Sequence, residues 1–388
     1  MRLAFCITEL NVGGAERIMC ELAIRLCARG HSVVVYSLQS CPVGVSCVSY
    51  LESAGIPVKF LDIRNVFSSI SGLNRLRKLL KEQSPDIFIS FLFHANVIGR
   101  IAAYLAGIKH IVSCIRVAER SARWHLFLDR WTSKITEKYI CVSNSVAEFS
   151  KTIGGLPENK IFVICNGVII PPLVQSDISS DEFENKTFEN KILENKIFEN
   201  KTNNKTNNKI IFVGRLDYQK GVDWFIQTVP SWLNELKNWE LIIVGDGNLR
   251  NELKNQIDNF SIGNSVKERI KIMGWREDAI DLIAESKILL LTSRWEGMPN
   301  VLLQAMSYAK PVVATNVEGV AELLGDYGEQ QMCTFGDTQL FAKKILNIAQ
   351  NNELAQKLGL ENRKRVIENF SIDKMVQQYE QLLLAINS

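Results

Sequence analysis

The 388-residue sequence lacks a long hydrophobic run and a C-x-x-C pair. Because no run approaches the ~20 apolar residues of a transmembrane helix, the chain is not expected to span a membrane. Its start, Met1-Arg2 followed by LAFCIT, is too short for a signal peptide. The nine scattered cysteines therefore predict reduced thiols, mostly core residues, in a cytosolic protein.

A strong net charge is also missing, since the formal net charge is only +3. The charges are unevenly placed: residues 1–170 hold 20 Lys and Arg against 12 Asp and Glu, and the remainder holds 25 against 30. The basic first half indicates an acidic partner, such as phosphate groups or an anionic membrane surface, although a solvated basic face has the same composition. Neither basic-aromatic interleaving nor zinc-finger spacing occurs, so no nucleic-acid partner is expected.

The sequence does contain a regular alternation of β-rich runs with stretches of helical spacing, which predicts parallel sheets with helices on both faces. In the first half, the predicted strands are 3–8, 32–38, 58–61, 86–92, 110–115, 138–143 and 161–165. The predicted helices there are 15–29, 73–82, 95–106, 123–135 and 145–152. In the second half, the predicted strands are 210–214, 240–245, 270–274, 287–292 and 311–315. The predicted fold class is therefore α/β, with two doubly wound, Rossmann-like domains in series.

A low-complexity segment separates the two halves. Residues 183–202 repeat FENKT, FENKI, LENKI and FENKT, a composition typical of solvated chain. We interpret 174–209 as an Asn- and Lys-rich linker insertion between an amino-terminal domain at 1–173 and a carboxy-terminal domain at 210–371. The final segment, 372–388, has apolar residues at helical spacing and predicts a helix that caps either domain.

The first predicted strand runs into ELNVGGAER ahead of a helix. Gly13 and Gly14 permit a tight turn and a close approach of the backbone, and free amides at the helix start suit a phosphate. The same glycines also suit a purely conformational turn, so this segment alone leaves both interpretations open.

Two cations follow the first strand of the second half, in IIFVGRLDYQKGVDWFI. Arg215 lies directly after the strand, and Lys220 lies at the start of the next helix. A lysine at that place opposes the helix dipole, so a bound anion such as a diphosphate would explain its presence. An ordinary charged surface loop is the alternative interpretation.

The stretch SRWEGMPNVLLQAM follows the apolar run KILLLT, which predicts a strand buried on both faces. Gly297 lets a ligand approach the backbone. Pro299 marks a helix start, after which Asn300 and Val301 supply free amides. Glu296 is placed to accept hydrogen bonds from sugar hydroxyls, and a solvated loop acid is the alternative interpretation of this residue.

Taken in this order and spacing, GGAER, GRLDYQKG, VGDG, SRWEGMPNVLLQAM and PVVAT resemble the retaining glycosyltransferases of the GT-B fold, family 4. The resemblance covers nearly the whole chain except 174–209. It implies two Rossmann-like domains facing a cleft, with a nucleotide-sugar donor held mainly by the second domain and an acceptor presented by the first. It also implies UDP as the nucleotide and no metal or other cofactor, in keeping with the absence of a D-x-D motif.

The resemblance also assigns roles to single positions. The expected catalytic residues are Glu296 at the donor sugar, Arg215 and Lys220 at the diphosphate, and His94 at the cleft. The expected donor-binding residues are Gly13, Gly14, Arg215, Lys220, Gly245, Trp275, Arg276, Glu296, Gly297, Met298, Pro299, Asn300, Val301 and Gln304.

Three of these assignments need a comment. Gln304 stands where the family has its second acid, and a neutral amide still donates and accepts hydrogen bonds to ribose hydroxyls. For His94, a structural hydrogen-bonding role is the alternative. Trp275, with Arg276, lies where the family packs the base. Two further turns, CVSNSV (Asn144, Ser145) and CNGV (Asn166, Gly167), are expected to serve local capping.

The expected function is transfer of a hexose or N-acetylhexosamine from a nucleotide-sugar to a glycan or lipid-linked acceptor of the cell envelope, such as lipopolysaccharide. We expect a cytoplasmic enzyme, peripheral at the inner membrane face. Within RVAERSARWHLFLDRW, the side chains Trp124, Phe127, Leu128 and Trp131 are placed to enter the interface while arginines meet headgroups. A buried amphipathic helix would have the same spacing.

Other functions remain compatible with the sequence. One alternative is a nucleotide-sugar epimerase on the same architecture. Another is a non-catalytic nucleotide- or glycan-binding protein in which Gln304 marks a lost activity. A nicotinamide dehydrogenase is disfavoured, because no predicted strand opens into G-x-G-x-x-G with a later acid.

Overall fold

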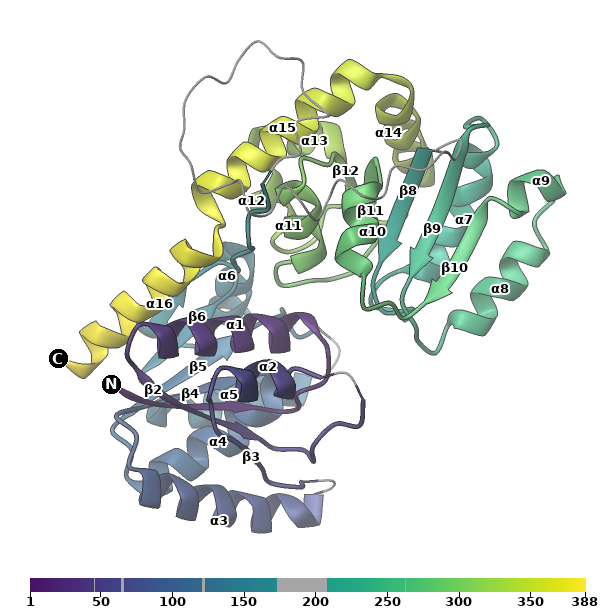
Figure 1. Cartoon of the computed structure of the whole chain (residues 1–388). Helices are drawn as coiled ribbons and strands as arrows, with labels where there is room; N and C mark the ends of the chain where they lie inside the picture. The colour runs from purple at the N-terminus through teal and green to yellow at the C-terminus, as the bar shows by residue number, and fades with distance from the viewer. Residues whose placement is uncertain (45, 64–65, 121–122, 173–207, 262) are drawn as a thin grey trace.

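The computed structural model describes residues 1–44, 46–63, 66–120, 123–172, 208–261 and 263–388. Two parallel sheets form the centres of two domains, with helices packed against both faces of each (Figure 1). The predicted α/β class with two doubly wound domains is confirmed. In the described part of the chain, no helix combines the length and apolar character that crossing a membrane requires.

The amino-terminal domain holds the first sheet. Its strands are β1 (Arg2–Ile7), β2 (Ser32–Ser37), β3 (Val58–Phe60), β4 (Ile87–Phe91), β5 (His110–Ile115), β6 (Lys138–Cys141) and β7 (Ile161–Val163). Its helices are α1 (Gly14–Ala28), α2 (Val48–Ser53), α3 (Val66–Gln83), α4 (Phe93–Ala106), α5 (Arg123–Trp131) and α6 (Asn144–Thr152). The strand order is β3-β2-β1-β4-β5-β6-β7, with parallel pairing throughout.

The carboxy-terminal domain repeats this plan. Its strands are β8 (Asn208–Val213), β9 (Trp239–Val244), β10 (Ile270–Gly274), β11 (Ile288–Leu291), β12 (Val312–Thr315) and β13 (Met332–Cys333), in the order β10-β9-β8-β11-β12-β13. Its helices are α7 (Val222–Leu233), α8 (Arg250–Asp258), α9 (Asn264–Lys267), α10 (Ala279–Glu285), α11 (Asn300–Ser307), α12 (Val320–Leu324), α13 (Gly328–Gln331), α14 (Thr338–Gln350) and α15 (Asn352–Asn369).

The second domain begins at strand β8, and the chain leaves it through a carboxy-terminal helix. Strand β8 begins two residues before the expected domain start at 210, and 174–207 of the predicted linker lies outside the described residues. At the other end, helix α16 (Ile372–Asn387) continues beyond α15 and returns to the first domain (Figure 1). Tyr379 of α16 is fully buried in the same core as strands β1, β4 and β5. Of the two domains that this helix was expected to cap, it therefore packs against the amino-terminal one.

The central strands of both sheets are buried on two faces, as their apolar sequences require. All five residues of β4 and all four of β11 are buried. One core cluster also crosses the domain boundary, because Val142 and Val146 of the first domain pack in the same cluster as Met298 and Leu302 of the second. The two domains therefore meet through side chains that flank the carboxyl ends of β6 and β11.

Candidate active site between the two sheets

The site lies where the strand order reverses in each sheet. In open α/β sheets, ligands bind outside the carboxyl ends of the strands at such a point. The first sheet reverses between β1 and β4, which are followed by Gly13 and His94 respectively. The second reverses between β8 and β11, which are followed by Arg215 and Glu296. The expected catalytic residues thus lie at the two reversal points.

Loops of the two domains are joined by hydrogen bonds at this place. Asn300 Nδ2 donates to Gly14 O at 2.9 Å, and Asn166 Nδ2 donates to Asn300 Oδ1 at 2.7 Å and to Met298 O at 3.2 Å. Asn166 therefore bridges the domains, and the expectation of a purely local capping role was wrong. The backbone of Gly297 also packs tightly against the first domain, since a Cβ there would lie 1.9 Å from Arg116 O.

Glu296 and Lys220 form the central ion pair of the site. Lys220 Nζ lies 2.5 Å from Glu296 Oε1, which also accepts a hydrogen bond from Ser293 Oγ at 2.6 Å. The side chains are only 17% and 9% exposed. A solvated loop acid is therefore excluded for Glu296. The two charges neutralise each other. An anionic ligand that binds the ammonium group of Lys220 would therefore take the place of the Glu296 carboxylate.

A glycine brings Lys220 to this pair. Gly221, at φ +65°, precedes helix α7, and a Cβ there would meet Thr292 O at 2.1 Å. The close approach of this loop to the end of β11 places Lys220 beside Glu296. Only glycine fits both the left-handed backbone and the short contact.

Arg215 lies on the same loop and is exposed. Its guanidinium donates to Gln219 Oε1 at 2.9 Å and lies 3.4 Å from Asp217 Oδ2. Exposed ion pairs contribute only about 0–1 kcal/mol, so this group is free to turn toward a ligand at little cost. An ordinary charged surface loop, the alternative interpretation of the two cations, therefore fits the exposed Arg215. It does not fit Lys220, which is mostly buried.

The remaining donor-side residues extend along the same edge of the second sheet. Gly245, after β9, has φ +138°, and a Cβ there would lie 1.8 Å from Gly214 O. Trp275 is half-exposed after β10, and the adjacent Arg276 is paired with Asp278 at 2.6 Å. The structure does not bring Trp275 and Arg276 into contact with Glu296.

Helix α11 starts where the sequence predicted. Pro299 is its N-cap residue, and Asn300 is its first residue, followed by Val301. Gln304 lies one turn along the same helix and is half-buried. Met298 is buried, and its sulfur accepts a hydrogen bond from Asn166 N.

His94 is the second residue of helix α4 and lies beside an aromatic cluster. Leu92, the N-cap residue, has φ 70°, a strained value for a residue with a side chain. Phe93 stacks on His125 with ring centroids 3.5 Å apart, and the His94 and His125 rings lie 6.0 Å apart. Burial and the neighbouring His125 lower the pKa of His94, which favours a neutral imidazole.

Several residues that shape the site were not singled out from the sequence. Arg294 donates to both carboxylate oxygens of Asp223 at 2.7 Å and lies over the Tyr218 ring, which fixes the loop before Glu296. The hydrogen bonds from Arg294 lower the pKa of Asp223. Because Asp223 is 71 residues away in sequence, no local pattern reveals the pair.

A buried acid in the first domain was also missed. Glu16, in GGAER, is 8% exposed, and burial raises the pKa of its carboxyl group. A Cβ on Gly13 would lie 2.2 Å from its Oε2, so a larger residue at position 13 would displace the end of this side chain. The charges of Arg116 and Arg215 act on the same carboxylate. An acid three residues after a glycine N-cap was the available sequence signal.

A second set of contacts joins the domains beside the site. Glu322 accepts hydrogen bonds from the backbone amides of Asn144 at 2.8 Å and Ser145 at 2.9 Å, and Glu318 pairs with Arg120. The N-cap of α6 is Ser143, whose Oγ accepts from Val146 N. Asn144 and Ser145 therefore contribute to interdomain contacts, and the expectation that they only cap locally was wrong.

Known protein families match both domains. The model described as Glycosyltransferase Family 4 matches residues 12–170, and the model described as Glycosyl transferases group 1 matches residues 207–351. The chain belongs to these glycosyltransferases. The expected family and the expectation of a sugar-transferring enzyme are thereby confirmed.

Relatives and solved structures agree. An Escherichia coli "UDP-Gal:alpha-D-GlcNAc-diphosphoundecaprenol alpha-1,3-galactosyltransferase" is 26% identical over 82% of this chain and 80% of its own. A Campylobacter jejuni alpha-1,4-N-acetyl-D-galactosaminyltransferase, whose named acceptor is a GalNAc-GalNAc-diNAcBac-PP-undecaprenol, is 26% identical over 100% and 99%. The crystal structure of Anabaena HepE with UDP and glucose has a TM-score of 0.80 at 20% identity, covering 99% and 100% of the two chains. This likeness confirms the GT-B fold.

Proposed function

We propose that this glycosyltransferase moves a hexose or N-acetylhexosamine from a UDP-sugar, with retention of configuration, to a lipid-linked or glycan acceptor of cell-envelope polysaccharide synthesis. The buried Lys220–Glu296 pair at the reversal point of the second sheet carries the proposal. The printed names of the Escherichia coli and Campylobacter jejuni relatives, which include a UDP-sugar and undecaprenyl diphosphate acceptors, support the substrate class.

On the donor side, the diphosphate would replace Glu296 as the partner of Lys220. Its growing charge would be met by Lys220, by Arg215 and by the first amides of α11, at Asn300 and Val301. Glu296, released from the lysine, would accept hydrogen bonds from the sugar. These cations and amides would serve in place of a metal, so we expect transfer to continue in the presence of a chelator such as EDTA.

On the acceptor side, His94 lies in the first turn of α4, after the carboxyl end of β4. A neutral imidazole both donates and accepts a hydrogen bond, as contact with a sugar hydroxyl requires. We propose that His94 orients the sugar while the acceptor hydroxyl attacks from the face that the diphosphate leaves.

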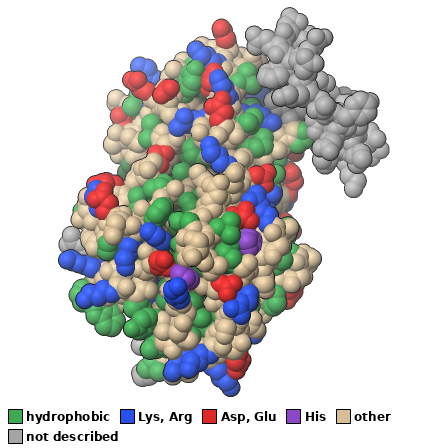
Figure 2. All heavy atoms as spheres, turned by 90° about the vertical axis from the view of Figure 1, so that its left-hand side faces the viewer, with side chains coloured by type: hydrophobic (Ala, Val, Ile, Leu, Met, Phe, Trp, Pro, Cys, Tyr) green, Lys and Arg blue, Asp and Glu red, His purple; other side chains and the backbone are tan. Residues whose placement is uncertain are grey.

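We also propose that helix α5 contacts an anionic membrane surface. Trp124, Phe127 and Trp131, at helical spacing, are 58%, 68% and 66% exposed, whereas a buried helix would hide them. Exposed Arg130 and Lys134 lie beside them, and Figure 2 shows further Lys and Arg side chains over the amino-terminal domain, the lower half of that view. Exposed aromatic residues next to cations are typical of helices at a membrane interface.

A thermal-shift panel of UDP-, GDP-, ADP- and dTDP-sugars tests the donor site. A ligand at about 100 times its Kd stabilises the fold by about 2.7 kcal/mol, which gives a clear rise in Tm. We expect a rise with UDP-sugars that is lost in Arg215→Ala. A rise with another nucleotide would overturn the choice of UDP, and no rise at all would favour a non-catalytic protein. Products formed from the donor alone would instead indicate an epimerase.

Sedimentation with liposomes tests the membrane contact. We expect binding to phosphatidylglycerol-containing vesicles at low salt, and reduced binding of Phe127→Ser. The matched control is Tyr50→Ser, which removes an aromatic ring of comparable exposure from another helix of the same domain. Equal pelleting of the two variants would contradict the role of α5.

A further inference from the structure

A polar pocket opens in the amino-terminal domain beyond the carboxyl ends of β1 and β2. It has a volume of about 360 Å³, and its lining residues are Glu9, Leu10, Asn11, Gln39, Ser40, Cys41, Pro42 and Ile63. None of the roles assigned so far uses these residues. A volume of this size falls within the range of small-ligand sites in proteins.

Two hydrogen bonds of Thr8 connect the pocket with the start of α4, where His94 lies. Ala95 N, next to His94, donates to Thr8 Oγ1 at 3.4 Å, and Gln39 N donates to Thr8 O at 3.0 Å. Strand β2, which leads to Gln39, is separated from β4 by β1 alone, so the two strand ends are roughly 10 Å apart. A ligand unit in the pocket would therefore lie beside a sugar held at His94.

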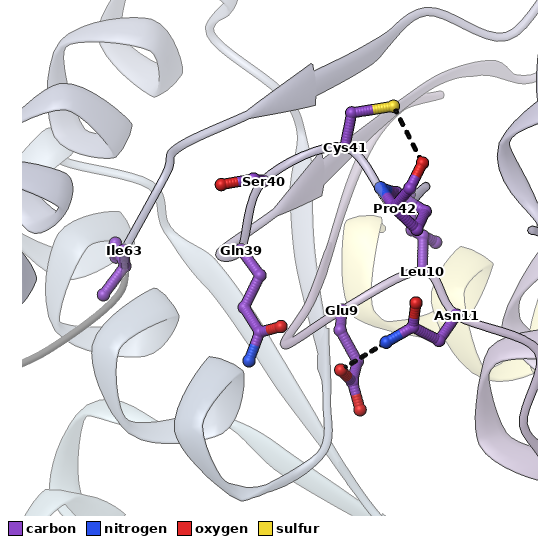
Figure 3. A pocket seen from close by; sticks show the side chains of 8 residues that line it. All are labelled: Glu9, Leu10, Asn11, Gln39, Ser40, Cys41, Pro42 and Ile63. Atoms are coloured by element: carbon purple, nitrogen blue, oxygen red, sulfur yellow. Dashed lines mark hydrogen bonds between the residues drawn. The ribbon is translucent and has the colours of Figure 1, made fainter. Parts of the chain in front are cut away.

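The lining is rich in groups that bind hydroxyls and amides. Figure 3 shows Glu9 and Gln39 pointing to the same side, with Asn11 Nδ2 donating to Glu9 Oε2 at 2.7 Å. Ser40 adds a hydroxyl that points toward the side of Ile63 (Figure 3). Carboxylate, amide and hydroxyl groups together both donate and accept hydrogen bonds. A sugar carries the matching groups around its ring.

The charge of the lining selects among sugars. Among the described residues that line it, Glu9 is the one carboxylic acid, and none is Lys, Arg or His. A uronic acid or a phosphate would place a second negative charge beside Glu9, and none of these described side chains offsets it, which is unfavourable. A neutral hexose or an N-acetylhexosamine meets no such repulsion, and Leu10, Pro42 and Ile63 offer apolar surface to its C–H groups.

We propose that this pocket is an acceptor subsite for a neutral sugar, adjacent to the sugar whose hydroxyl is attacked. The proposal rests on the proposed function, because it takes the acceptor to be a glycan. It extends that function by requiring an acceptor with at least two sugars, of which the one in the pocket is uncharged.

The exposed thiol of Cys41 provides a direct test. The nine cysteines all lie in the described part of the chain, where Cys41 is exposed and Cys165 is half-buried. The rate of N-ethylmaleimide labelling at each cysteine is measured by mass spectrometry in the full-length protein. The probes are the methyl glycosides of glucose, galactose, N-acetylglucosamine and N-acetylgalactosamine, with methyl glucuronide as the charged counterpart.

We expect at least one neutral glycoside to slow labelling of Cys41, by about tenfold when nine-tenths of the pocket is filled. Labelling of Cys165 should not change, nor should methyl glucuronide protect Cys41. In Gln39→Ala, a substitution at an exposed side chain, the protection should weaken. Protection by none of the neutral glycosides, or equal protection by the glucuronide, would overturn the proposal.

A second measurement separates this proposal from the donor site. Complete labelling of Cys41 should leave the thermal shift with a UDP-sugar unchanged, and Cys41→Ser treated in the same way is the control for labelling elsewhere. A donor shift without sugar protection would reject the pocket but not the glycosyltransferase function. Sugar protection without any donor shift would reject the proposed donor and leave a glycan-binding pocket.

Discussion

At the scale of single residues, the centre of the site is an ion pair that is formed without a bound ligand. Glu296 accepts hydrogen bonds from both Lys220 and Ser293. Arg215 lies exposed on the neighbouring loop, where it donates a hydrogen bond to Gln219. The sequence indicated both cations and the acid, because each follows a buried strand. It did not indicate that Lys220 and Glu296 pair with each other, since 76 residues separate them and no local period connects them.

Replacing Lys220 should affect both catalysis and stability. In Lys220→Ala we expect kcat to fall about 10²–10³-fold, the scale of one lost preorganised donor at a developing negative charge. We also expect the free energy of unfolding to fall by about 3–5 kcal/mol, because Glu296 loses the partner of a mostly buried pair. Lys237→Ala, at an exposed lysine, is the control and should change stability by less than about 0.5 kcal/mol.

A double-mutant cycle checks the cause of that loss. Lys220→Met combined with Glu296→Gln removes both charges, so the double variant should lose less stability than the sum of the two single variants. Chemical denaturation of all four proteins measures the difference. Strict additivity would show that the two side chains do not stabilise the fold as a pair.

The pKa of His94 gives a pH prediction. Because burial and His125 lower this pKa, the neutral ring persists below the usual value of about 6.5. If the neutral ring contacts the acceptor, kcat/KM should fall only as the pH drops below about 6.5, and folding stability should decline in the same direction as the ring takes up a proton. In His94→Gln the acidic limb of the rate profile should be weaker. An unchanged limb would show that a group other than His94 causes it.

At the scale of elements, short apolar runs made the strands of the first sheet predictable to within two residues, both for the buried central strands and for the partly exposed edge strands β3 and β7. Weak patterns were missed: α2 buries only Val48 and Leu51, and β13 has two residues. The helical spacing of 123–135 was correct, but spacing alone did not distinguish a buried stripe from the exposed aromatic residues of α5. In the same way, the spacing of 372–388 predicted a helix but did not show which domain it packs against.

The docking of α16 offers a test with neighbouring residues. Leu383 is fully buried in the first domain's core, whereas Leu384 is 51% exposed. Leu383→Ala should lower the free energy of unfolding by about 2–5 kcal/mol through lost burial and a residual cavity. Leu384→Ala should change it by no more than about 0.5 kcal/mol. Urea denaturation of both variants measures the contrast, and equal effects would mean that α16 does not pack in solution as it does here.

At the scale of the whole molecule, the site is complete only when the two domains face each other. Their contacts join residues far apart in sequence: 286 residues separate Asn300 from Gly14, and 178 separate Glu322 from Asn144. Such contacts could not be predicted from the sequence, because they depend on how two separately patterned domains pack. The resemblance to a two-domain family predicted two facing domains but not the residues that join them.

Glu322 is the clearest of these residues, because its carboxylate binds two backbone amides at the start of helix α6. A carboxylate at a helix N-terminus is stabilised by the helix dipole, which makes this contact favourable. Glu322→Ala removes the contact between the domains, and Glu322 belongs to neither sheet. We expect a larger radius of gyration in small-angle X-ray scattering without ligand, and a higher KM for the donor with a smaller change in kcat. The control is Glu235→Ala, at an exposed acid remote from the boundary. If both variants scatter alike and share the wild-type KM, Glu322 does not hold the two domains together, and their contact must depend on the 297–300 loop and the apolar cluster around Met298.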